Sequence, residues 1–482
     1  MICISVTPQS RTLAPADLLN AARYGDLIEL CLDHFIKTPN VEELLRAIDK
    51  PILVSCRKPE DGGSWRFSEA ERVQLLRQVI AAEPEYVELD LDIAQQIPRF
   101  GKTKRVVAFT SLNRPLSSID DIFEECWKAK ADVVKVTWPT ETLDAAWPML
   151  VAVSERRELP VVGFGIGKAG LTFSLLGRKY GSPWIYAALE QGMESFPEQP
   201  TVWQLRDDYR LDDIGAKTKF LGIIGFGQAE NTTARVLNAA FQMMEKSIRC
   251  LPLVPSDLNR LPKMLARMKI NGLVVDPSFA SELGQMVSAP DDSPESSGYM
   301  DVLMQRSEGW KGMATLPEAI AVAGEQSTGS ANWAGRGTIM VVGTSPLARA
   351  AAQYFESKGA AVSLAAPSDN AAAASARQSG VRHVPWHAIH DVRLDTLVLA
   401  DATLDCGVEK GQLNPMIIRE RIAVVDLTRY PAESVFAEEA RARGAVYIEP
   451  SSIFAQQLRV QFRTLAGREL PEDAFRLGLT ET

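Results

Sequence analysis

The feature that most constrains the fold is a regular alternation of short apolar runs with helical segments over the first 210 residues. The intervening segments, such as 68–83 and 118–131, carry apolar residues at helical spacing. Apolar strands separated by helices pair in parallel, with both faces of the sheet covered. Eight such units predict a closed (β/α)8 TIM barrel over residues 1–210. The apolar runs are 2–6, 27–32, 51–56, 86–91, 105–110, 133–138, 161–166 and 184–189.

A second set of strand and helix signals begins after the charged stretch at 206–219. It predicts an α/β lobe over 218–325 and, after polar linkers, a Rossmann-type dinucleotide-binding lobe over 336–482. The fold class is therefore α/β throughout. The strand-like runs are 220–226, 250–255 and 272–276 in the first lobe, followed by a strand–turn–helix–strand unit at 338–366 and the runs 396–401, 422–427 and 446–450; the linkers are 288–298 and 324–337.

Length and composition exclude several classes of protein. A chain of 482 residues is long enough for two to four domains. A net charge of −9 without a basic stripe argues against nucleic-acid binding. The first residues do not resemble a secretory signal, and no apolar run is long enough to span a membrane. Six cysteines, none in a CxxC pair, favour reduced thiols and a cytoplasmic location.

Lys135 lies in the middle of an otherwise apolar run, ADVVKVTWP at 131–139. Because side chains alternate along a strand, Lys135 points the opposite way from Val134 and Val136. An amine facing a barrel interior would have its pKa lowered by desolvation and could attack a carbonyl to form a Schiff base. The alternative is a lysine at the rim, with its stem packed and its ammonium in solvent.

Polar residues at the ends of other strands are candidates for the same site. Glu29 interrupts the second strand, and Arg57 follows the third, with Asp61 four residues later. Ser195 and Gln199 follow the eighth strand. Each of these residues also has an ordinary interpretation as part of a solvated surface, where an arginine–carboxylate pair contributes little.

Four segments resemble the type I 3-dehydroquinate dehydratases, over roughly residues 1–205. The most specific is GFGIGKAGLTFSLLGRKYGSPWIYA, and the resemblance implies a compact (β/α)8 barrel that needs no cofactor and forms an imine through Lys135. It also implies that Glu29 is a substrate or network carboxylate and that Arg57 and Asp61 form a pair. Ser195 and Gln199 would belong to a segment that closes over the substrate. The four segments are 29–35, 56–65, 131–138 and 163–187.

Three residues depart from the pattern of that family. Thr110 stands where the resemblance places a general-base histidine, Ser174 where it places the arginine that grips the substrate carboxylate, and Cys31 where it places a second arginine. General acid–base catalysis typically contributes about 10²–10⁴-fold. The sequence therefore predicts reduced or uncertain dehydratase activity.

The region from about 218 to 470 resembles shikimate dehydrogenase, which implies an NADP-binding lobe. The catalytic lysine and aspartate of that family align with Phe279 and Leu316, and its substrate-binding serines with Asn231 and Thr233. The phosphate-binding turn reads GTSPLAR, which keeps Gly343 and Arg349 as candidate cofactor-binding residues but replaces two glycines with serine and proline. We therefore expect this half to be inactive as a dehydrogenase, and NADP binding is doubtful.

The leading hypothesis is a lyase of the shikimate pathway that converts 3-dehydroquinate into 3-dehydroshikimate through Lys135. One alternative is a non-catalytic binding or regulatory protein that retains both folds. Another is a Schiff-base lyase with a different carbonyl substrate. The expected partner is a cyclic hydroxy acid, with no metal, nucleic acid or membrane, and a homodimer is a possible assembly.

Overall fold

The computed structural model describes residues 1–155, 157–275, 279–287 and 297–479. Compactness divides the chain into two units, Met1–Leu261 and Pro262–Thr482. The three domains expected from the sequence stay a prediction, because the first of these units contains more than the barrel.

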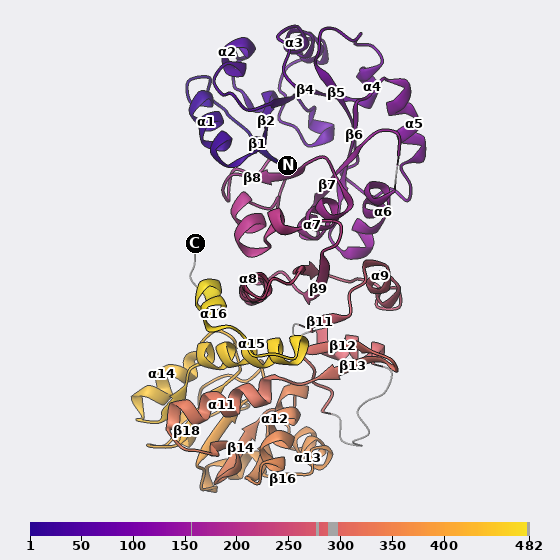
Figure 1. The fold of residues 1–482 in the computed structure, drawn as a ribbon. Coiled ribbons are helices and arrows are strands. Elements are labelled where there is room, and N and C mark those ends of the chain that lie inside the picture. Colours follow the sequence, from indigo (N-terminus) through magenta and orange to yellow (C-terminus); the bar gives the residue numbers. More distant parts are fainter. Residues whose placement is uncertain (156, 276–278, 288–296, 480–482) are drawn as a thin grey trace. The chain divides into compact units, whose positions relative to one another are not determined.

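The first unit begins with an eight-stranded parallel barrel (Figure 1). Its strand order runs from β7 through β6, β5, β4, β3, β2 and β1 to β8, so the barrel is nearly closed. All eight strands expected from the apolar runs are present, and the predicted barrel is confirmed. The strands are β1 (Ile2–Val6), β2 (Leu27–Cys31), β3 (Ile52–Ser55), β4 (Tyr86–Asp90), β5 (Lys104–Thr110), β6 (Val133–Pro139), β7 (Val161–Ile166) and β8 (Ile185–Ala188).

Helices connect successive strands and cover the outside of the barrel. The helix between β3 and β4 starts at a capping box, in which Ser68 and Glu71 each accept a backbone N–H of the other residue. The helices are α1 (Ala14–Tyr24), α2 (Val41–Leu45), α3 (Glu69–Ala81), α4 (Leu91–Ala94), α5 (Asp120–Lys128), α6 (Leu143–Ser154) and α7 (Gly170–Tyr180).

The alternation of side chains along the strands assigns one set of residues to the barrel interior. Val133 of β6 packs in one apolar cluster with residues of six other strands and with Phe196. Because Lys135 follows Val133 by two positions, it faces the same interior. Val134 and Val136 face the surrounding helices. The cluster comprises Cys3, Leu27, Leu53, Val106, Val133, Val162, Phe164, Trp184, Tyr186 and Phe196.

The first unit also contains β9 (Lys219–Ile224), α8 (Gln228–Met243) and β10 (Ile248–Leu253), which dock on the barrel. The Asp144 carboxylate at the start of α6 accepts the Ser256 backbone N–H at 3.0 Å and its hydroxyl at 2.8 Å. The fully buried Thr172 of α7 donates to the Pro252 carbonyl at 2.5 Å. The segment after the barrel is therefore fixed to helices α6 and α7.

The second unit contains a six-stranded parallel sheet with the order β16-β15-β14-β17-β18-β19, as expected for a Rossmann-type lobe. Before it lie β11 (Gly272–Val275) and an antiparallel hairpin of β12 (Val302–Arg306) and β13 (Gly309–Met313). The sequence pattern missed this hairpin because its strands mix exposed and buried residues without strict alternation. The sheet strands are β14 (Thr338–Val342), β15 (Ala361–Ala365), β16 (Arg382–His383), β17 (Thr396–Leu399), β18 (Ala423–Asp426) and β19 (Val446–Ile448).

Helices cover the sheet of the second unit (Figure 1). None of the helices in the described part of the chain has the length and apolar character needed to cross a membrane. The predicted cytoplasmic location stays a prediction. The helices are α9 (Leu261–Met268), which starts at the division between units, α10 (Ala280–Leu283), α11 (Leu316–Thr328), α12 (Pro346–Ser357), α13 (Asp369–Gln378), α14 (Val435–Ala442), α15 (Pro450–Ala466) and α16 (Glu472–Leu479).

Asp90 at the end of β4 provides a test of the barrel's electrostatics. Burial raises its pKa from 3.8 to about 6, although Arg72 Nη2 lies 2.6 Å from its Oδ2. The folded chain therefore holds the Asp90 proton to higher pH than the unfolded chain. This contribution to stability is present below about pH 4 and is lost as the pH rises through about 6.

We expect the free energy of unfolding of the wild-type protein to fall relative to that of Asp90→Asn by about 3 kcal/mol between about pH 4 and about pH 6. Urea unfolding of both proteins at several pH values measures the difference. Asp49→Asn, at an exposed carboxylate, should run parallel to the wild type. A constant difference between wild type and Asp90→Asn would contradict the shift.

Candidate active site

Lys135 is enclosed in the barrel interior, where its side chain is 2% exposed. Its Nζ donates to Glu88 Oε2 of β4 at 2.7 Å and lies 3.9 Å from Glu29 Oε1 of β2. Both carboxylates are buried as well. The cost of burying the ammonium is thus offset by two acidic partners from other strands.

Aromatic rings form the rest of the wall around this amine. Nζ lies 4.7 Å from the centroid of the Tyr186 ring and 5.8 Å from that of Phe164. A cation near ring faces is attracted by their quadrupole, and more strongly where water is excluded. The amine is therefore enclosed between two aromatic rings and two carboxylates.

A chain of hydrogen bonds links Glu29 to the segment after β8. The Ser5 hydroxyl donates to Glu29 Oε2 at 2.6 Å and accepts from Gln199 Nε2 at 3.2 Å. Gln199 Oε1 in turn accepts the Ser195 backbone N–H at 2.8 Å and its hydroxyl at 3.1 Å. Ser195 and Gln199 are thereby linked through Ser5 to Glu29, and their role in substrate binding stays a prediction.

The two carboxylates differ in their affinity for a proton. Burial raises the pKa of Glu29, but Lys135 and Arg57 outweigh this effect and lower it overall. For Glu88, burial dominates, and the pKa is raised despite the contact with Lys135. Glu29 therefore stays ionised, whereas Glu88 is the carboxylate that takes up a proton more readily.

Arg57 lies buried beyond β3 with most of its guanidinium unused. Its Nη2 lies 3.5 Å from Cys31 Sγ, and its Nε and Nη1 have no hydrogen-bond partner among the described residues. The expected pair with Asp61 is not formed, because the Asp61 carboxylate lies beside Lys58 Nζ at 3.7 Å. Arg57 is thus a buried cation with free N–H groups.

Phe196 covers the mouth of the barrel. Its ring lies 4.5 Å from the Arg57 guanidinium carbon and 5.0 Å from the ring of Phe164. Gly62, at a φ of +80°, makes room for it, since a Cβ there would lie 2.4 Å from Phe196 Cε1. Access to Lys135 from this side therefore requires the ring of Phe196 to move.

The family of the first domain follows from comparison with known proteins. Residues 2–216 match the family model for type I 3-dehydroquinase. These residues form a type I 3-dehydroquinase domain.

Similar proteins share this domain alone or with a second one. The bifunctional 3-dehydroquinate dehydratase/shikimate dehydrogenase, chloroplastic, of Arabidopsis thaliana is 23% identical over 504 residues, covering 98% of this chain and 83% of its own. A 3-dehydroquinate dehydratase of Methanococcus maripaludis strain C7 is 24% identical over 44% of this chain and 99% of its own. Among solved structures, one of the dehydroquinate dehydratase and shikimate dehydrogenase from S. pombe is similar over 99% of this chain and 98% of its own. The sequence identity is 12% and the TM-score is 0.44.

The dehydroquinase domain has no charged group at the three positions where the sequence departs from the family. Thr110 ends β5, and the Ser174 hydroxyl donates to the Gly170 carbonyl within its own helix at 2.9 Å. Cys31 is buried beside Arg57. The structure instead adds Glu88, which the sequence analysis missed. The available signal was a carboxylate between Val87 and Leu89 in a buried strand, the same signal that singled out Lys135.

Gly343 and Arg349, the candidate cofactor-binding residues of the second unit, lie against neighbouring groups of the fold. Gly343 directly follows β14 at a φ of +138°, and a Cβ there would lie 2.9 Å from Asp401 Cβ. Arg349 Nε donates to the Ser297 carbonyl at 3.0 Å, and its Nη1 donates to the Thr344 carbonyl at 2.8 Å. Its guanidinium is thus used within the fold.

Three other residues at the positions compared with shikimate dehydrogenase are also bonded or buried within the fold. Asn231 accepts from the Tyr209 hydroxyl at 3.0 Å, and Thr233 donates to the Ala229 carbonyl at 2.8 Å. Leu316 is fully buried at the start of α11. The turn before Phe279 lies outside the described residues at 276–278.

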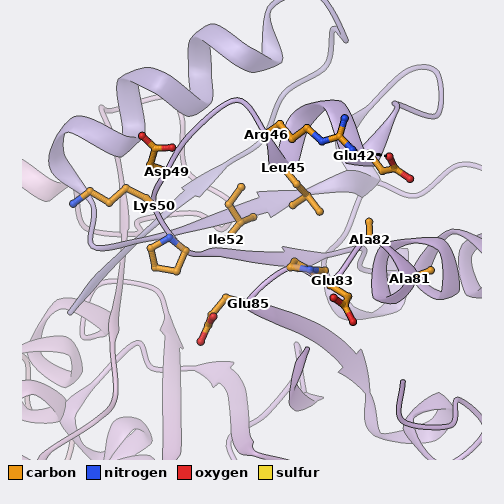
Figure 2. Close-up of a pocket in the computed structure, with 12 residues that line it drawn as sticks. Glu42, Leu45, Arg46, Asp49, Lys50, Ile52, Ala81, Ala82, Glu83 and Glu85 are labelled. Carbon is orange, nitrogen blue, oxygen red and sulfur yellow. Dashed lines mark hydrogen bonds and ion pairs between the residues drawn. The ribbon is translucent and has the colours of Figure 1, made fainter. Parts of the chain in front are cut away.

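Two cavities of the dehydroquinase domain lie outside the lysine site. One of about 680 Å³ opens at the N-terminal end of β3 and is lined by residues of both charges, including Glu42, Arg46 and Lys50 (Figure 2). The other, of about 120 Å³, reaches Ser5 beside Asp17 and Met193. Of these two cavities, only the second adjoins the hydrogen-bond chain that ends at Glu29.

We expect Phe196→Ala to expose Lys135. Trapping of the amine with a small ketone and borohydride should become at least about tenfold faster, equivalent to about 1.4 kcal/mol of opening free energy. The lost packing should lower stability by about 3–5 kcal/mol. Mass spectrometry of the adduct and thermal unfolding measure the two effects. Met193→Ala, at an exposed residue of the same segment, should change neither the trapping rate nor the stability. Equal trapping rates for wild type and Phe196→Ala would contradict a covering role.

Proposed function

We propose that the dehydroquinase domain converts 3-dehydroquinate into 3-dehydroshikimate, a step of the shikimate pathway, through an imine on Lys135. The observation that supports this most is the enclosed amine, held 2.7 Å from Glu88 inside a domain of this family. Desolvated lysines are the nucleophiles of Schiff-base enzymes.

Imine formation requires the amine to lose its proton before it attacks the ketone. Glu88 is placed to take that proton, since its Oε2 is the direct hydrogen-bond partner of Nζ. The neutral nitrogen then adds to the carbonyl carbon, and the resulting hydroxyl leaves as water when Glu88 returns the proton. Glu29, which stays ionised, stabilises the positive charge that the nitrogen carries in the imine.

The remaining polar groups would bind the hydroxy acid around the ring. Arg57 offers two unused N–H groups, which suit a carboxylate or hydroxyl oxygen. Ser195 and Gln199 would orient the ligand through the segment that covers the mouth, and Asp61 would act from the edge of the site. The barrel would use no cofactor for this reaction.

For the second unit we propose no dehydrogenase step and no use of NADP. The Thr344 N–H points toward the Asp401 carboxylate at 3.4 Å, so an anionic group already lies where a pyrophosphate would approach. Pro346 removes one N–H from the start of α12, and Arg349 is bound to two carbonyl groups. These residues do not fit a dinucleotide phosphate.

Borohydride reduction in the presence of 3-dehydroquinate tests the imine directly. The wild-type protein should gain a stable mass adduct on the peptide that contains Lys135, and should release 3-dehydroshikimate when borohydride is omitted. Lys135→Ala should show neither. Lys168→Ala, which removes an exposed lysine of the same domain, should behave as the wild type. A wild type without an adduct would refute the proposed function, and an adduct without turnover would favour another carbonyl substrate.

Replacement of Arg57 tests the role of its free N–H groups. We expect Arg57→Met to raise KM by about 10- to 150-fold, because a hydrogen bond to a charged group contributes about 1.5–3 kcal/mol. The rate constant kcat should change much less. Steady-state kinetics measure both quantities, with Arg66→Met at an exposed arginine of the following loop as the control. An unchanged KM would show that Arg57 does not bind the substrate.

A further inference from the structure

The dehydratase reaction needs a base for a carbon-bound proton, and the domain lacks a histidine for this role. Thr110 ends β5 at the expected position. His34 is the single histidine in residues 1–261, and it lies 3.5 Å from the buried Asp33 on the segment after β2. Burial lowers its pKa, and the hydrogen-bond chain from Gln199 to Glu29 does not include it.

The position of the missing base can be deduced from the imine. The proton to be removed is on the carbon next to the imine carbon. That carbon is two bonds from Lys135 Nζ. A base must lie within hydrogen-bond reach of that proton, either directly or through one water. The carboxylates of Glu88 and Glu29 lie beside Nζ, at 2.7 Å and 3.9 Å.

Glu29 is the less suitable of the two. Its Oε2 already accepts from the Ser5 hydroxyl, and its pKa is lowered overall by Lys135 and Arg57. Glu88 has a pKa raised by burial, which brings its proton affinity closer to that of an efficient general base.

The strand arrangement explains how Glu88 reaches the amine. Strand β5 lies between β4 and β6, and its Ala108 is level with Lys135. Ala108 is on the same face as Val106, which belongs to the interior cluster. A methyl group at this position leaves the space above β5 open, so the Glu88 side chain crosses it to contact Nζ.

Resting on the proposed function, we propose that Glu88 is the catalytic base that takes the carbon-bound proton, in place of a histidine on β5. When its carboxylate accepts this proton, the C–H electron pair forms a carbon–carbon double bond, and the imine electrons move to the nitrogen of Lys135. The enamine then expels the hydroxyl on the neighbouring carbon, and Glu88 donates the proton, so the group leaves as water. Hydrolysis of the new imine releases the product and restores Lys135.

Glu88→Gln distinguishes this step from imine formation by rate. Because Glu88 also takes the proton of the amine, its loss slows formation of the imine, which still accumulates on long incubation, whereas removal of the carbon-bound proton needs the base in every turnover. On incubation in D2O, wild-type protein should exchange the hydrogen next to the ketone of 3-dehydroquinate and turn the substrate over. In Glu88→Gln, exchange and turnover should fall about 10²–10⁴-fold, while prolonged borohydride trapping still labels Lys135. Retained labelling with unchanged exchange and turnover would overturn the assignment. A wild type that cannot be labelled would instead refute the proposed function.

The substitution Thr110→His provides a second, independent test of Glu88 as the base. If Glu88 is the base, Thr110→His should raise the turnover of Glu88→Gln by more than tenfold and that of the wild type by less. A Glu88→Gln protein that fails to form the adduct even on prolonged trapping, and does not recover with Thr110→His, would overturn the assignment, because the role of Glu88 in imine formation would then account for the whole loss of turnover. Thermal unfolding of each variant confirms that the comparison is made between folded proteins.

Discussion

The ion pair between Lys135 and Glu88 is the interaction on which the interior of the barrel depends. A lone ammonium in this enclosed space would be too unfavourable to persist, so its partners must come from facing strands. Glu88 comes from β4 and Glu29 from β2, while the small Ala108 on the intervening β5 leaves room for Glu88 to reach the amine. One buried side chain on β6 thereby restricts the choice of residues on three other strands.

Much of the fold could be predicted from the sequence, because strands buried on both faces are continuous apolar runs. Lys135 was found for the same reason, as a charge inside such a run. Glu88 gave the same signal, but its meaning depends on which strands face each other, and one strand gives no information on that. Phe196 could not be predicted, since an aromatic residue in a loop acquires a covering role only when the Gly62 turn and the Arg57 side chain are in place.

The buried polar groups of the two units differ in whether they have hydrogen-bond partners within the fold. Asp301 of the second unit is completely buried, and its carboxylate accepts from Thr315, from the Leu316 backbone and from Gln457 Nε2. Such a satisfied carboxylate holds strand, helix and helix together and needs no ligand. The fold of the second unit is therefore stabilised at this point by its own side chains, without a ligand.

In the barrel, by contrast, Glu29 Oε1 and Arg57 Nε and Nη1 are buried without a hydrogen-bond partner among the described residues. Each such group costs about 1–3 kcal/mol, so a fold selected only for stability would remove them. Their charges are opposite, yet they are not joined in an ion pair, and the Phe196 ring packs against the cation. A ligand with both hydroxyl donors and a carboxylate would satisfy both groups at once, and the free energy it recovers there would oppose the packing of Phe196 over the mouth.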